Sequence, residues 1–112
     1  MSGGAQLSVT ELRRSTRHPV SYAVAGEHRQ IGEIQLLIAN ISAHGFMATG
    51  QIQIGRGERV VIRLPHIGRI EAHLIWSTED RAGFQFERII RPDDFTQLIK
   101  TLQPNPRLRR ER

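Results

Sequence analysis

The sequence predicts an all-β fold: a small six-stranded antiparallel barrel followed by one C-terminal amphipathic helix. Three observations predict it. Apolar and polar residues alternate over several short runs, glycine-containing turns separate these runs, and the apolar spacing changes to that of a helix only after Pro92. Six short strands with short connections favour a closed or nearly closed barrel.

The first two predicted strands cover residues 19–24 and 31–41, and Gly26, Glu27 and His28 mark the hairpin between them. The second strand is rich in β-branched residues and is apolar at both parities. This pattern predicts a central strand that is covered on both faces.

The other predicted strands are short and alternate. They cover residues 46–48, 58–64, 70–76 and a final strand that contains Phe84 and Phe86. Side chains of one parity, such as Val60 and Leu74, are expected in the core. Trp76 shares the parity of Leu74, so we expect its ring to pack at least partly in the core. The alternative role for this ring is a platform on which a purine base stacks.

After Pro92 the sequence predicts one short helix. Its apolar residues follow at the spacings i, i+3, i+4 and i+7: Phe95, Leu98, Ile99 and Leu102. Asp93 or Asp94 is suited to cap the first turn. A helix of about ten residues is too short to be stable alone. We therefore expect its apolar stripe to pack on the barrel, across an open end.

The chain of 112 residues has the length of one domain. We expect a flexible N-terminus over residues 1–10, the domain over 11–103 and a basic tail over 104–112. The absence of cysteine excludes disulfides, a thiol nucleophile and thiolate metal sites. No export signal is recognisable, and no stretch approaches the roughly 18 apolar residues of a membrane span. These observations predict a cytoplasmic protein.

The net charge of +5 indicates an anionic partner. The excess lies in two segments: residues 11–17 carry three arginines against one glutamate, and residues 107–112 carry four against one. The second segment is expected to be a solvated tail. Its alternative role is contact with an acidic protein, nucleic acid or anionic lipid.

Two short polar signatures carry the functional information: Arg13-x-x-x-Arg17 and Asn40-x-Ser42-x-x-Gly45. A guanidinium group bonds bidentately to phosphate oxygens or to the O6 and N7 acceptors of guanine. Asn40 and Ser42 share a parity, so on an extended backbone both side chains point to one face. Gly45 fits a turn that needs a positive φ, or a place where a ligand passes too close for a Cβ atom.

Read as RxxxR followed by [D/N]xSxxG, these signatures resemble the PilZ domain family, whose members are receptors for the bacterial second messenger cyclic di-GMP. The resemblance covers roughly residues 11–102 and includes Gly83-Phe84-x-Phe86. It implies a bacterial barrel protein that binds cyclic di-GMP. The implied binding residues are Arg13, Arg17, Asn40, Ser42 and Gly45, with Arg14 and Trp76 as further candidates.

We therefore expect a stand-alone receptor that uses no cofactor and binds one cyclic di-GMP per chain. Ligand is expected to order the arginine segment before Pro19, which relays the signal to an effector protein. Two alternatives stay open. One is a protein-interaction module of the same fold without nucleotide affinity. The other is a small basic barrel for single-stranded nucleic acid, for which the chain has few aromatic residues.

Catalysis and metal binding are not expected. The five histidines show no HxH, HxxxH or HExxH spacing. Ser42 and His44 are too close in sequence to face each other as nucleophile and base, and no third group is placed to orient them.

Overall fold

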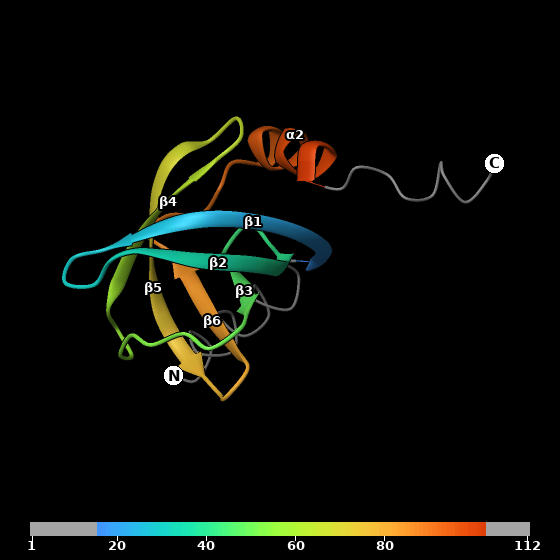
Figure 1. Ribbon diagram of the computed structural model, residues 1–112. Coiled ribbons are helices and arrows are strands. Elements are labelled where there is room, and N and C mark those ends of the chain that lie inside the picture. Colours follow the sequence, from blue (N-terminus) through green and yellow to red (C-terminus); the bar gives the residue numbers. More distant parts are fainter. Residues whose placement is uncertain (1–15, 103–112) are drawn as a thin grey trace, which may run out of the picture.

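The computed structural model describes residues 16–102, which form a closed antiparallel barrel with a helix across one end (Figure 1). Around the barrel the strands follow the order β1-β2-β3-β6-β5-β4. The elements are β1 His18–His28, β2 Gly32–Ile41, β3 Gly45–Thr49, β4 Arg59–Leu64, β5 Gly68–Ser77, β6 Arg81–Phe86 and the helix α2 Pro92–Leu102. The predicted fold class is confirmed. The segments predicted over residues 1–10 and 104–112 lie outside the described residues.

Inward-facing side chains of the strands form a continuous apolar core. Three phenylalanines lie at its centre, where the Phe46 ring stacks on Phe84 at 4.8 Å between centroids and lies 5.6 Å from the ring of Phe86. The alternation predicted for residues 58–64 is observed, because Val60 and Leu64 are buried while Arg63 is exposed. Alternating burial therefore places the core where the sequence predicts it in this strand.

The predicted hairpin at residues 26–28 is wrong. The strand β1 continues through these residues to His28, and the turn consists of residues 29–31. Gly26 is buried against the core: a Cβ atom there would lie 3.1 Å from Cδ1 of Leu36 and 3.5 Å from Cγ2 of Ile62. The buried ring of His28 closes the turn, because its Nδ1 accepts hydrogen bonds from the backbone amides of Gln30 and Ile31, both at 3.1 Å.

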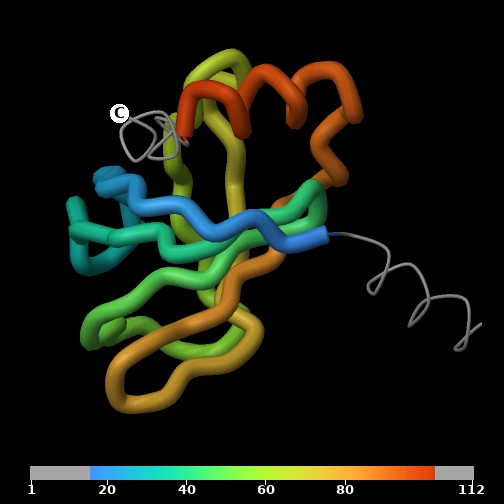
Figure 2. Tube along the Cα trace, turned by 90° about the vertical axis from the view of Figure 1, so that its right-hand side faces the viewer, coloured from blue at the N-terminus to red at the C-terminus, as the bar shows by residue number. Residues whose placement is uncertain are grey.

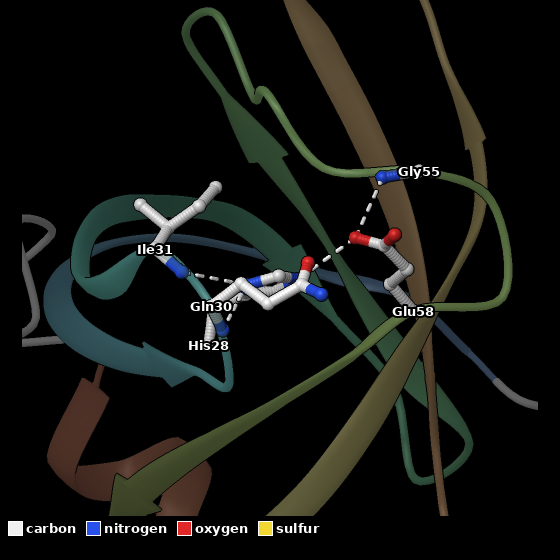
Figure 3. Close-up of polar contacts among 5 residues, drawn as sticks. All are labelled: His28, Gln30, Ile31, Gly55 and Glu58. Carbon is white, nitrogen blue, oxygen red and sulfur yellow. Dashed lines mark hydrogen bonds and ion pairs between the residues drawn. The ribbon is translucent and has the colours of Figure 1, made fainter.

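A polar latch closes the barrel between β1 and β4. These strands pair at only two positions, Glu27 with Val61 and His28 with Val60. Beside them, Nε2 of His28 donates to Oε1 of Glu58 at 2.8 Å, and the amide of Gly55 donates to the same oxygen at 3.0 Å (Figure 3). Since Nδ1 of the ring is an acceptor, the ring hydrogen resides on Nε2. The amide of Gly55 and the ring of His28 lower the pKa of Glu58.

A bulge in β2 changes which of its side chains are buried. Ile38 pairs with Ala48 and Asn40 pairs with Met47, so Ala39 is an extra residue. Leu36 and Ile38 precede this bulge in the core, and Ile41 returns to the core after it. The expectation that β2 is covered on both faces is wrong, because Leu37 is 43% exposed. The bulge accounts only for Ile41, which has the second parity and is buried.

A second bulge, in β5, turns Trp76 outward. Leu74 pairs with Phe84 and Trp76 pairs with Gly83, which leaves Ile75 as the extra residue. Trp76 consequently lies on the outer face of the sheet and is 39% exposed. The expected core packing of Trp76 is wrong, because the extra residue Ile75 reverses the alternation of side chains that follows Leu74.

The helix α2 packs on the barrel as predicted, with Leu98 and Leu102 buried. Figure 2 shows α2 at the same end of the barrel as the β4–β5 turn. Nε2 of His66 in this turn lies 2.9 Å from Oγ1 of Thr101 on the helix. No helix within residues 16–102 is long and apolar enough to span a membrane.

Candidate functional site

The predicted binding residues within the described part of the chain lie close together. A hollow of about 190 Å³ brings Arg17, Ser42 and Gly45 together with Trp76. Its other lining residues are His44, Phe46, Ile75, Gly83, Phe84 and Gln85. Asn40 is joined to this group through Arg17. Arg13 and Arg14 lie outside the described residues.

Arg17 and Asn40 are paired at the rim of the hollow. Nη1 of Arg17 donates to Oδ1 of Asn40 at 3.0 Å, and Nδ2 of Asn40 lies 3.9 Å from the sulfur of Met47. The amide of Asn40 therefore turns its oxygen towards the guanidinium group. Because this hydrogen bond is exposed, an anion at the rim can replace Asn40 as the partner of Arg17 at low cost.

Ser42 belongs to a tight turn after the end of β2. Its backbone amide donates to the carbonyl oxygen of Gly45 at 2.8 Å, and its hydroxyl accepts from the amide of His44 at 3.2 Å. The residue is only 4% exposed. The predicted extended segment from Asn40 to Ser42 is thus interrupted, since Ser42 shapes the turn beneath the hollow.

Gly45 is required by the close approach of another strand. Its backbone is not in the left-handed region, so the first of its two expected roles, a turn with a positive φ, is wrong. A Cβ atom at this position would overlap the carbonyl oxygen of Phe84 and lie 3.0 Å from Cα of Gln85. Glycine therefore allows β3 to pair with β6 at the edge of the hollow.

Trp76 covers Gly83, the residue opposite it on β6. A Cβ atom on Gly83 would overlap Nε1 of the indole and lie 2.9 Å from its Cδ1. The ring therefore lies directly against the β6 backbone and leaves part of its surface open. Within residues 16–102, its N–H group has no hydrogen-bond acceptor.

No family model matches the chain, and no curated protein sequence matches it. Among solved structures it is similar to the PilZ domain of YcgR from Escherichia coli, with a TM-score of 0.60 and 18% sequence identity over 88% of this chain and 95% of that one. The chain has the PilZ fold. A second similar structure is the Bacillus subtilis inhibitor of motility MotI/DgrA, with a TM-score of 0.57 and 23% identity. This match covers 89% of our chain and 53% of MotI/DgrA.

The PilZ barrel also has a larger hollow, of about 650 Å³, beside the latch. None of the predicted site residues that the structure describes lines it. Its walls carry the carboxylates of Glu27, Glu58 and Glu71 together with Arg29 and Arg59. In contrast, the described residues that line the smaller hollow include Arg17 and no carboxylate. Charge therefore favours the smaller hollow as the place for an anionic ligand.

Six residues that line the smaller hollow of this PilZ barrel were not among the predicted site residues: His44, Phe46, Ile75, Gly83, Phe84 and Gln85. The position of Ile75 depends on the β5 bulge, which alternation does not reveal. His44 lies inside the second signature but is not one of its specified residues. Gln85 was detectable, because it alternates with Phe84 and Phe86 and so faces outward.

Proposed function

We propose that this chain is a receptor for cyclic di-GMP that binds the ligand at the hollow beside Trp76. One observation carries the proposal. The outward-facing indole of Trp76 and Arg17, whose exposed hydrogen bond to Asn40 a ligand can replace, border the same hollow, and the described lining of this hollow contains no carboxylate. An aromatic face suits a guanine base, and a guanidinium group suits phosphate. The similar YcgR structure is described as a PilZ domain with c-di-GMP, which supports this ligand.

In the proposed complex, one guanine stacks on the outer face of Trp76. Arg17 leaves Oδ1 of Asn40 for a ligand phosphate, and the freed oxygen accepts from the N–H groups of guanine. The hollow is smaller than the roughly 300–1,000 Å³ of pockets that enclose a ligand. The remainder of the ligand therefore lies along the outer surface of the barrel. Arg13 and Arg14, outside the described residues, are proposed to supply further positive charge.

Relay of the signal is proposed to use the ordering of the segment that precedes β1. A second connection runs through the turn beneath the hollow. The carbonyl oxygen of His44 accepts from the amide of Phe86 at 2.8 Å, and that of Ala43 accepts from Ile90 at 3.0 Å. These bonds link the turn to the segment that leads into α2. A ligand on the turn would thereby affect the surface that an effector protein contacts.

Isothermal titration with cyclic di-GMP tests the proposal on the wild type, Arg17→Ala and Arg29→Ala. Wild type should saturate near one ligand per chain. Arg17→Ala should bind at least about tenfold more weakly, because a hydrogen bond to a charged group contributes about 1.5–3 kcal/mol. Arg29 is an exposed arginine in the turn at the other end of β1, so its variant is the matched control and should bind as wild type does.

Equal affinity of all three proteins would contradict the assignment of the site. Complete absence of binding by the wild type would contradict the receptor function and favour a protein-interaction module of the same fold.

A further inference from the structure

We propose that Gln85 is a further ligand contact, whose side-chain amide bonds the polar edge of the purine stacked on Trp76. This inference rests on the proposed function and adds a residue to its site. Neither signature in the sequence specifies Gln85. The direction of the Gln85 side chain, its neighbours and its free hydrogen-bonding groups support this role.

The strand β6 fixes the direction of Gln85. Phe84 and Phe86, on either side of it, are buried at 4% and 3% exposure and pack in the core. Because neighbouring side chains of a strand point to opposite faces, the amide of Gln85 points outward. The residue is exposed and lines the hollow.

The neighbours of Gln85 leave its amide open on the side of β3. Its partner there is Gly45, which has no side chain to cover it. Gly83 lies two residues earlier on the same face of β6, and the indole of Trp76 packs directly against it. Residues i and i+2 of a strand are about 7 Å apart. A purine on the outer face of the indole would therefore extend towards the amide of Gln85.

The side-chain amide of Gln85 is free to bind a ligand. It makes no hydrogen bond with any residue between 16 and 102, whereas the amide of Gln35 already donates to Glu33 at 3.0 Å. A free amide offers two donor hydrogens and one acceptor oxygen. These groups match the O6 and N7 acceptors of guanine or its N–H donors. A base that covered this amide without pairing would leave a desolvated polar group, which is unfavourable.

Affinity measurements compare Gln85→Ala with Gln97→Ala. Gln97 is the matched control, since it is exposed on α2 and its side chain has no hydrogen bond within the described chain. We expect Gln85→Ala to weaken cyclic di-GMP binding by roughly 3- to 10-fold, the effect of one neutral hydrogen bond. The control variant should bind like wild type, and both variants should keep the wild-type unfolding temperature.

Side-chain amide resonances in ¹⁵N-labelled protein provide a readout that a purely structural role would not change. The resonance pair of Gln85 is assigned by its absence from the spectrum of Gln85→Ala. Cyclic di-GMP should shift this pair and leave the pair of Gln97 in place. If the wild type binds while Gln85→Ala keeps full affinity, or the Gln85 pair does not move, the assignment of Gln85 alone is overturned. If the wild type does not bind, the proposed function fails and this assignment fails with it.

Discussion

Two glycines keep the candidate site open, and a different kind of neighbour requires each of them. Gly45 faces the backbone carbonyl of Phe84, whereas Gly83 faces the side chain of Trp76. A backbone held in a sheet cannot move without loss of strand pairing, but an exposed indole can rotate away. The two positions should therefore respond differently to an added methyl group.

Gly45→Ala is expected to destabilise the fold. Relief of the overlap requires β3 and β6 to separate, so the free energy of unfolding should fall by about 1–3 kcal/mol or more. Urea denaturation of wild type and variant measures this change. A variant as stable as wild type would contradict the close approach of β3 and β6 at Gly45.

Gly83→Ala is expected to cause a smaller loss of stability than Gly45→Ala. It should nevertheless clearly weaken cyclic di-GMP binding, because the added methyl group displaces the indole of Trp76 from its position against Gly83. In a Trp76→Ala background, the same added methyl group meets no ring. Its effect on the free energy of unfolding should then largely disappear, which a double-mutant cycle detects as non-additivity. Strictly additive effects would contradict the contact between Trp76 and Gly83.

At the scale of elements, the latch between β1 and β4 compensates for their short pairing. Two ladder positions join the strands, and Glu58 adds contacts to His28 and to the amide of Gly55. The pKa of Glu58 is lowered from its usual 4.5, first by the Gly55 amide and then by His28. The carboxylate form of Glu58 is therefore the form that the folded barrel prefers.

The pH dependence of stability should reveal this preference. A lowered pKa stabilises the fold above pH 4.5, and this stabilisation is lost as the pH falls through the lowered value. Glu58→Gln should be less stable than wild type at pH 7, and the difference should shrink on acidification. Glu79→Gln, an exposed control in the β5–β6 turn, should follow the wild-type curve. Parallel curves for wild type and Glu58→Gln in urea denaturation between pH 7 and pH 3 would contradict the latch.

Local patterns predict most elements of this fold but not its bulges. Alternation identifies the strand over residues 58–64, and the i, i+3, i+4 spacing identifies α2. The extra residues Ala39 and Ile75 differ in no visible way from their neighbours, because a bulge is defined by its partner strand. This is why the outward position of Trp76 could not be predicted. Gly26 was misleading for another reason, since it lies inside β1 as a buried residue and forms no turn.

The candidate site could be predicted where it depends on neighbours in the sequence, but not where it depends on strand pairing. The two signatures identify Arg17, Asn40 and Gly45 as candidates, and the structure places these residues close to one another. Gln85 joins them only because β6 pairs with β3. The proposed role of Gln85 can therefore be inferred only once the register of the sheet is known.

At the scale of the whole molecule, the strand order brings the residues of the candidate site together. Because β6 lies between β3 and β5, it brings the turn after β2 next to the bulged end of β5. Residues more than thirty positions apart in sequence, Gly45 and Trp76, thereby border one hollow. Closure of the barrel through the latch takes place away from this hollow, so the site and the latch can be altered separately.

Tryptophan fluorescence tests the central claim most directly, because Trp76 is the only tryptophan of the chain. Any change in its emission reports on the hollow itself. Titration with cyclic di-GMP should change the emission of Trp76 in a saturable way, with an end point near one ligand per chain, and Arg17→Ala should require at least about tenfold more ligand. An emission spectrum that stays constant while calorimetry shows saturation would place the ligand elsewhere and contradict the account.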